Sequence, residues 1–363
     1  MPRLPEQRRP RDGADREREG VISPVVSRLR TGSAGEGIWS KSLTRQEVER
    51  LRKIARWVPY PVGVRLIRWW TALSWVQRRS LARHATAFER LLESLAAAGV
   101  RRAPVHRALA INVGRDYRLA ALARLSAPAF SRWVAVEGWE HVESALARGR
   151  GAILANQHTA VGQVLALVVR RRGLDLATVG DNSLKLALVS ETESDARPRT
   201  RPPAGTDPQA RFVHYLANAR QVLIGGGLVQ IPTDTYSGNG LVRLPLLGRG
   251  RGFWPGFAEL ADMTGAAVIP VFASVDGRER VVVRFHPPLA GAGPTAKRPE
   301  RVQALMSSYR DWYERMWIES PEQFTFSHHE RLLRIFARRA GKPQAGPTPG
   351  RDRGGADGDK TDT

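Results

Sequence analysis

A short apolar run that stops abruptly at polar residues is the feature that most constrains the fold of this chain. Residues 151–155 read Gly-Ala-Ile-Leu-Ala, and Asn156, Gln157 and His158 follow at once. Helix-like sequence comes next, over residues 162–172. A buried strand followed by a loop and a helix is typical of a parallel α/β sheet, whose loops present reactive side chains at the carboxyl ends of the strands. The pattern therefore predicts an α/β fold with His158 at the edge of its sheet.

The same alternation continues through the C-terminal part of the chain. We expect strands at 134–138, 151–155, 176–179, 228–232, 267–272 and 280–285, with helices at 139–147, 162–172, 212–223, 256–264 and 299–318. This order predicts a mixed, largely parallel sheet flanked by helices, in an α/β domain that covers residues 128–338. Residues 1–44 and 339–363 are rich in polar residues, glycine and proline, and we expect both to be disordered tails, the first of them basic.

Residues 45–127 are predicted to form a basic helical region that precedes the α/β domain. Of these, residues 57–127 carry 12 arginines and three acidic residues. A predicted helix over 62–79 places Trp69 and Trp75 among aliphatic residues, with Arg65, Arg68 and Arg79 on one side. Such a helix fits a membrane interface or a core position with one charged edge. The surrounding positive charge favours docking on an anionic membrane, to which each basic residue contributes about 1 kcal/mol.

Composition and short motifs exclude several kinds of site and partner. The chain has no cysteine, which excludes disulfides and thiolate chemistry, and its N-terminus lacks the apolar segment of a signal peptide. We find no apolar run of about 18 residues that would predict a spanning helix. The net charge of +22 would suit nucleic acid, but no nucleic-acid-binding motif accompanies it, so we expect no nucleic-acid partner. His328 and His329 are adjacent and would diverge on a helix, so we expect no metal site.

His158 is the leading candidate for chemistry. One interpretation makes it a general base that removes a proton from a hydroxyl, with N–H groups at the start of the following helix stabilising an oxyanion. The alternative is a structural histidine that caps a helix or bonds a carbonyl. Asp234 follows the predicted strand 228–232. If this strand is a neighbour of the strand 151–155, Asp234 lies at the same sheet edge as His158; the alternative is that it caps a turn.

Five sequence blocks in a fixed order resemble one protein family. The blocks are residues 134–141, 149–158, 245–248, 256–270 and 321–328. Together they resemble the lipid A biosynthesis acyltransferase family, a branch of the lysophospholipid acyltransferase superfamily that includes phosphatidylinositol mannoside acyltransferases. The resemblance covers roughly residues 45–335, and we expect residues 321–326 to be structural.

The resemblance implies acyl transfer from an acyl carrier protein or coenzyme A thioester to a hydroxyl of a lipid or glycolipid. No cofactor is expected, and the implied location is the cytoplasmic face of the inner membrane. His158 matches the family's histidine, but Gln163 stands where the family has a carboxylate. An amide can orient an imidazole but lacks the charge that stabilises an imidazolium. Asp234 is the best substitute, and the alternative is a catalytically weak or inactive homologue that binds lipid or acyl carrier protein.

Candidate substrate-binding residues lie near this motif and in two further segments. Asn156 precedes the histidine. Arg243, Arg249 and Arg251 surround the block at 245–248 and are candidates for binding phosphate, although a solvated basic face is the alternative. Leu246 and Leu247 in that block are compatible with an acyl groove. The polar loop at 190–210 holds weaker candidates, namely Glu191, Glu193, Asp195, Arg197, Arg199 and Arg201.

Overall fold

The computed structural model describes residues 45–79, 81–179, 206, 208–234, 241–293 and 295–337. The predicted tails at 1–44 and 339–363 lie outside the described residues. The six charged candidates in the loop at 190–210 also lie outside them.

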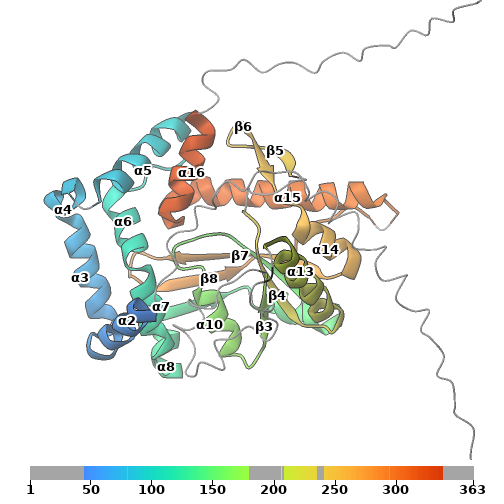
Figure 1. Ribbon diagram of the computed structural model, residues 1–363, viewed down its shortest axis with the longest axis horizontal. Coiled ribbons are helices and arrows are strands. Elements are labelled where there is room, and N and C mark those ends of the chain that lie inside the picture. The colour runs from blue at the N-terminus through green and yellow to red at the C-terminus, as the bar shows by residue number, and fades with distance from the viewer. Residues whose placement is uncertain are drawn as a thin grey trace, which may run out of the picture.

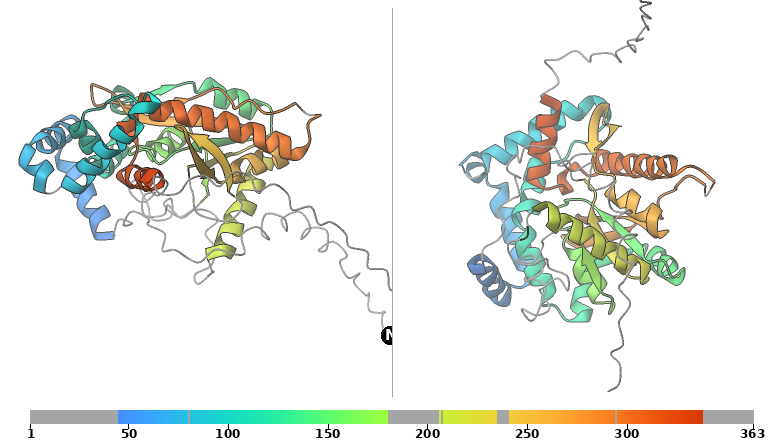
Figure 2. Two further views of the ribbon diagram at one scale, coloured as in Figure 1. Left: turned by 90° about the horizontal axis from the view of Figure 1, so that it is seen from above. Right: turned by 45° about the vertical axis from the view of Figure 1, so that its right-hand side comes forward.

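A layer of helices precedes the sheet and lies on one side of the molecule (Figures 1 and 2). It consists of α2 (Arg45–Trp57), α3 (Tyr60–Ala72), α4 (Ser74–Arg79), α5 (Ala82–Leu95), a short 3-10 turn (Ala96–Ala98), α6 (Val105–Val113), α7 (Arg115–Ala123) and α8 (Ala127–Trp133). In the described part of the chain, no helix has both the length and the apolar character needed to cross a bilayer.

The single helix predicted over 62–79 is interrupted, so this prediction was wrong. Leu73 has an extended backbone, with φ −68° and ψ 122°, which ends α3 before α4 begins. The hydroxyl of Thr71 bonds the carbonyls of Ile67 and Arg68, an arrangement that bends helices. The change of direction lets the fully buried Val76 pack into a small core with α5 and α6.

The α/β part alternates strands and helices, as the sequence predicts. Its elements are β1 (Val134–Glu137), α9 (Glu140–Ala147), β2 (Ala152–Asn156), α10 (Val164–Arg170), β3 (Leu176–Thr178), α13 (Pro208–Ile224), β4 (Leu228–Pro232), β5 (Val242–Leu246), β6 (Arg249–Phe253), α14 (Gly256–Thr264), β7 (Ala267–Val275), β8 (Val281–Phe285), α15 (Arg298–Glu319), η2 (Pro321–Gln323) and α16 (Phe326–Ala337). The strands β5 and β6 form a separate antiparallel hairpin that we did not predict.

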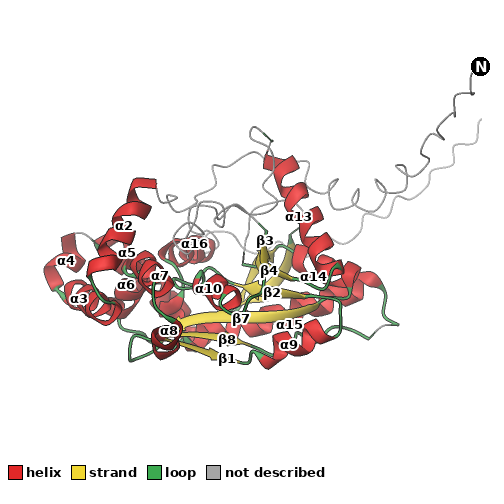
Figure 3. Cartoon of the chain, turned by 90° about the horizontal axis from the view of Figure 1, so that it is seen from below, coloured by secondary structure: helices red, strands yellow, loops and turns green. Residues whose placement is uncertain are grey.

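The main sheet has the order β1-β8-β7-β2-β4-β3. Strands β7, β2, β4 and β3 are parallel to one another, and β8 joins β7 in antiparallel orientation. Helices lie on both sides of this sheet (Figure 3). The predicted mixed, largely parallel sheet flanked by helices is therefore confirmed.

The central strand β2 is buried on both faces. Ala152 and Leu154 belong to one core cluster, together with residues of α3, α7, α9 and α10. Ile153 and Ala155 belong to the other cluster, with residues of α13, α14 and α15. Burial on both faces explains why the strand is uniformly apolar rather than alternating. The first cluster also joins the N-terminal helices to the sheet, so these helices and the α/β domain share a core.

Candidate active site

The two strands at the centre of the sheet bring His158 and Asp234 together. β2 and β4 are parallel, and their register pairs Asn156 with Pro232, an offset of 76 residues. His158 and Asp234 follow this pair at the same offset, so they leave the sheet edge side by side. Thr233 extends the pairing, because its N–H donates to the carbonyl of Asn156 at 3.0 Å. Strand adjacency thus produces the juxtaposition that the sequence left conditional.

Asp234 is a buried carboxylate that lies close to three nitrogen atoms. Its Oδ1 lies 2.6 Å from Nδ1 of His158, and its Oδ2 accepts the backbone N–H of His158 at 2.9 Å. Oδ2 also lies 2.9 Å from Nε2 of His328. The Asp234 side chain is 0% exposed, whereas that of His158 is 35% exposed. His158 therefore exposes part of its side chain while its Nδ1 faces a buried carboxylate.

The protonation states follow from these contacts. Burial raises the pKa of Asp234, but the charges and hydrogen bonds of His158 and His328 lower that pKa further, so it lies well below its ordinary value. Burial lowers the pKa of His328 against the opposing effect of Asp234. At neutral pH, Asp234 is thus ionised and His328 neutral. Because a carboxylate only accepts, the neutral form of the His158 ring has its proton on Nδ1 and its lone pair on Nε2, as a general base requires.

His328 is a site residue that the sequence analysis missed. Its ring stacks on that of His158, with centroids 4.9 Å apart and an interplanar angle of 16°. The neighbouring His329 instead has its Nε2 2.9 Å from the carbonyl of Pro321, away from Asp234. The two side chains diverge, as expected on a helix. The available signal for His328 was its position at the end of the block 321–328, but we considered it only as a metal ligand paired with His329.

Gln163 lies at the start of α10. It is the residue before Val164, its carbonyl accepts the N–H of Ala166 at 3.2 Å, and it is partly buried. Within the described ranges, no hydrogen bond joins Gln163 to His158. The carboxylate beside Nδ1 comes from Asp234 in this chain.

The loop after His158 uses several of its polar groups internally. The N–H groups of Ala160, Gly162 and Val164 donate to backbone carbonyls at 2.8, 3.2 and 3.0 Å. These three amides therefore do not form the oxyanion site expected at the helix start. Asn156 is 6% exposed, so its side chain presents little surface to solvent.

The three arginines expected to bind phosphate differ in their surroundings. Arg243 and Arg249 are exposed on the hairpin of β5 and β6. Arg251 is 3% exposed, and its guanidinium donates to the carbonyl of Asp234 at 2.9 Å. It also lies over two aromatic rings, at 4.7 and 4.9 Å from their centroids. Arg251 therefore supports the segment that carries Asp234, which corrects its expected exposure to a phosphate.

The apolar block next to these arginines belongs to the core. Leu246 and Leu247 are 1% and 5% exposed. The N–H of Leu247 donates to the carboxylate of Glu314 on α15 at 2.6 Å, which fixes the turn of the hairpin. These leucines therefore do not line an open acyl groove in this structure.

Residues 321–325 hold the His158 loop through backbone hydrogen bonds. The carbonyl of His158 accepts the N–H of Thr325 at 3.1 Å, and the carbonyl of Gln323 accepts the N–H of Ala160 at 2.8 Å. The amide side chain of Gln323 bonds both the N–H and the carbonyl of Val275, at 2.8 and 3.1 Å. Their expected structural role agrees with these bonds.

Among the described residues, one group has the composition of a metal site. It comprises His158, Asp234 and His328, whose candidate ligand atoms lie within 4.8 Å of one another. Two ligands at about 2.0–2.2 Å from one tetrahedral ion are separated by roughly 3.3 Å or more. The observed separations of 2.6 and 2.9 Å are hydrogen-bond lengths instead. We therefore interpret the group as a cluster of direct polar contacts, in which His158 is hydrogen-bonded to Asp234 and His328 lies close to the same carboxylate.

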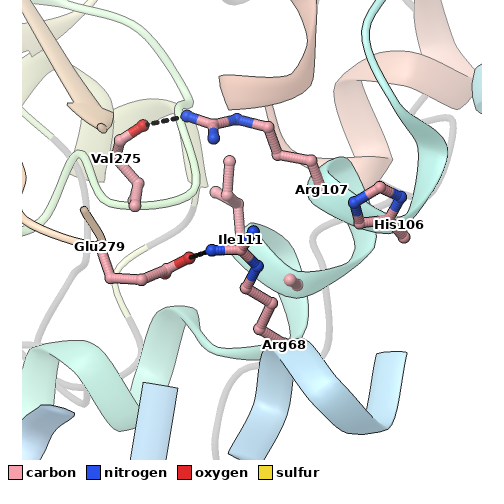
Figure 4. A pocket seen from close by; sticks show the side chains of 7 residues that line it. Arg68, His106, Arg107, Ile111, Val275 and Glu279 are labelled. Carbon is pink, nitrogen blue, oxygen red and sulfur yellow. Dashed lines mark hydrogen bonds and ion pairs between the residues drawn. The ribbon is translucent and has the colours of Figure 1, made fainter. Parts of the chain in front are cut away.

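A small cavity lies between α3, α6 and the turn after β7 (Figure 4). Its volume is about 30 Å³, room for about one water molecule. The guanidinium of Arg107 donates to the carbonyl of Val275 at 2.8 Å, and Arg68 pairs with Glu279 at 3.6 Å. Both cations therefore already have a partner within the protein.

The fold and the site define a class of protein: an α/β protein that holds a partly exposed histidine against a buried carboxylate at the carboxyl edge of parallel strands. The sequence model of the bacterial lipid A biosynthesis acyltransferases matches residues 117–333, and the chain belongs to this family. The resemblance inferred from the sequence blocks is confirmed, and the family supports an acyltransferase activity. No curated protein sequence matches the chain.

Proposed function

We propose that this protein moves a fatty acyl group from an acyl thioester to a hydroxyl of a membrane lipid or glycolipid, with His158 as the general base. The donor is an acyl carrier protein or coenzyme A thioester, and the protein's own side chains do the chemistry without a cofactor. One observation carries the proposal: the ring of His158 is partly exposed, while its Nδ1 lies 2.6 Å from a fully buried carboxylate. Such a pairing fixes the tautomer that a base requires.

The proposed reaction begins when Nε2 of His158 takes the proton of the acceptor hydroxyl. The hydroxyl oxygen attacks the thioester carbonyl carbon and forms a tetrahedral intermediate. When the intermediate collapses, the carbon–sulfur bond breaks, and the leaving sulfur receives the proton from the imidazolium. Asp234 remains ionised throughout and stabilises the imidazolium, which an amide at this position would not do.

Membrane docking is the second part of the proposal, and the surface of the N-terminal helices supports it. Large apolar side chains are exposed in α2, α3 and α4, namely Ile54, Trp57, Val62, Leu66, Trp69 and Trp75. Elsewhere in the described chain, only Val113 and Ile224 are exposed residues of this kind. Arg56 and Arg65 are exposed beside them. Indole rings with neighbouring arginines suit the headgroup region of an anionic leaflet, here the cytoplasmic face of the inner membrane.

Binding of substrate phosphate is assigned in this proposal to Arg243 and Arg249. Both are exposed on a hairpin whose strand β6 also contributes Arg251 to the Asp234 segment. The hairpin therefore lies beside the proposed reaction centre. A guanidinium binds phosphate through paired N–H donors and suits a phosphorylated lipid or acyl donor.

The test is incubation of purified protein with a radiolabelled acyl thioester and lipid acceptors presented in vesicles. We expect acyl transfer by the wild-type protein and a loss of at least about 10³-fold in His158→Ala, because the base is removed. His106→Ala is the matched control, since His106 lies on α6 beside the small cavity. Equal turnover in wild type and His158→Ala would end the proposal.

A further inference from the structure

We propose that His328 is a positioning residue that holds Asp234 so that Oδ1 of the carboxylate faces His158. The inference rests on the proposed function, because it assigns a role in general-base catalysis to a residue that does not touch the substrate. This role of His328 explains how the site keeps a well-oriented carboxylate, Asp234, although Gln163 stands where the family has a carboxylate.

The geometry gives each oxygen of Asp234 its own histidine. Nδ1 of His158 lies 2.6 Å from Oδ1, and Nε2 of His328 lies 2.9 Å from Oδ2. A carboxylate held at both oxygens cannot rotate about its terminal bond without losing a partner. Because the side chains of Asp234 and His328 are 0% and 4% exposed, water does not replace a lost contact. His328 therefore restricts the carboxylate to the orientation that serves His158.

The contacts of His328 favour one tautomer of its ring. Its Nδ1 lies 3.3 Å from the hydroxyl of Thr325, which also lies 3.0 Å from the hydroxyl of Ser327. With Thr325 donating to Nδ1, the proton of the neutral ring is on Nε2, which lies 2.9 Å from Oδ2 of Asp234. The result is a fixed chain of contacts from Thr325 through His328 and Asp234 to His158.

The rigid start of α16 places the ring. The side-chain oxygen of Asn112 accepts the N–H of Phe326 at 2.9 Å, and its amide nitrogen donates to the carbonyl of Phe324 at 3.0 Å. Asn112 is itself buried on α6. These bonds tie the first residue of α16 to a neighbouring helix, so the position of His328 does not depend on α16 alone.

The charged and titratable groups facing His328 come from three other segments. They are Asp234 after β4, His158 after β2 and Arg251 on β6, while His329 is the neighbour on its own helix. Asp234 is the acid among them. Loss of His328 would leave this carboxylate with one donor fewer and a stronger attraction for the proton on His158. Proton removal from the acceptor hydroxyl would therefore need a higher pH.

The test compares His328→Leu, His328→Gln and His329→Gln. His328→Leu should lower kcat by about 10- to 100-fold, the loss expected for one charge-assisted hydrogen bond, with KM nearly unchanged. The acid limb of its kcat/KM profile should move to higher pH. His328→Gln, which retains an N–H donor, should restore most of the activity.

His329→Gln is the matched control, since His329 is equally buried on the same helix but bonds Pro321. An unmoved acid limb in His328→Leu, or an equal shift in His329→Gln, would overturn the inference.

Nitrogen NMR of the histidine rings provides a second test that needs no turnover. In the folded wild-type protein, we expect a neutral His328 with its proton on Nε2 and a His158 with its proton on Nδ1. A proton on Nδ1 of His328 would refute the inference even if the His328→Leu variant does not fold. Absence of acyl transfer by the wild-type protein would instead end the proposed function, and the NMR result would still decide the role of His328.

Discussion

Replacement of Asp234 by asparagine probes the centre of the site most directly. The new side chain has nearly the same shape, but it carries one acceptor oxygen and one NH₂ group. The backbone N–H of His158 faces Oδ2 at 2.9 Å and can only donate. His328 lies 2.9 Å from the same oxygen. The amide oxygen of Asn will therefore occupy the Oδ2 position and place its NH₂ group where Oδ1 was.

This orientation has a specific consequence for catalysis. The NH₂ group then faces Nδ1 of His158, which must become an acceptor, so the ring proton moves to Nε2. A protonated Nε2 cannot take a proton from a hydroxyl. The corresponding change in a serine protease lowers turnover by about 10⁴-fold, which is about 5.5 kcal/mol in activation free energy. By analogy, we expect Asp234→Asn to lower turnover by about 10³- to 10⁴-fold.

The assay is single-turnover acyl transfer at saturating substrate, with unfolding measured in parallel. Asp276→Asn is the control, because Asp276 also follows a sheet strand but pairs with Arg280, outside the site. We expect Asp234→Asn to remain folded and to show His158 protonated on Nε2 by nitrogen NMR. A folded Asp234→Asn variant with activity within about tenfold of wild type would refute this account of the site.

Three further predictions follow from other parts of the structure. Burial lowers the pKa of His329 to about 3, so the unfolded chain binds a proton first as the pH falls below about 6.5. The free energy of unfolding should therefore fall by up to about 1.4 kcal/mol for each pH unit between these values. Denaturant titrations at a series of pH values should show a weaker dependence of this free energy on pH in His329→Gln. Trp69→Ala should weaken binding to anionic vesicles by about 5- to 30-fold in sedimentation assays, whereas Ile224→Ala, an exposed change on α13, should not. Gln163→Glu should give no gain in acyl transfer, because Asp234 already occupies Nδ1 of His158; a large gain would indicate a decayed site.

Local patterning was sufficient to predict most of the α/β elements. The predicted strand 228–232 and helix 256–264 match β4 and α14 residue for residue. These segments lie between strong local signals, such as the glycine run before the strand and Gly265 after the helix, whose φ of 70° ends it. The same patterning failed at Leu73, where packing of Val76 decided the direction of the chain.

The candidate site was only partly predictable. His158 and Asp234 each end a buried strand, so periodicity alone placed them at a sheet edge. The buried position of Arg251 was not predictable in this way, because a basic residue in a short hairpin is expected to be exposed to solvent. Its burial depends on Asp234 and on aromatic rings contributed from β6 and α15.

By itself, the sequence determined the class of fold, the histidine that leaves the central strand and the acyltransferase family of the chain. These properties depend on residues close together in sequence or on motifs in a fixed order. Only the tertiary structure decided which carboxylate faces that histidine and that His328 contacts the same carboxylate. The physical reason is that β2, β4 and α16 meet through sheet register and helix packing over separations of 76 and 94 residues, which no local pattern encodes.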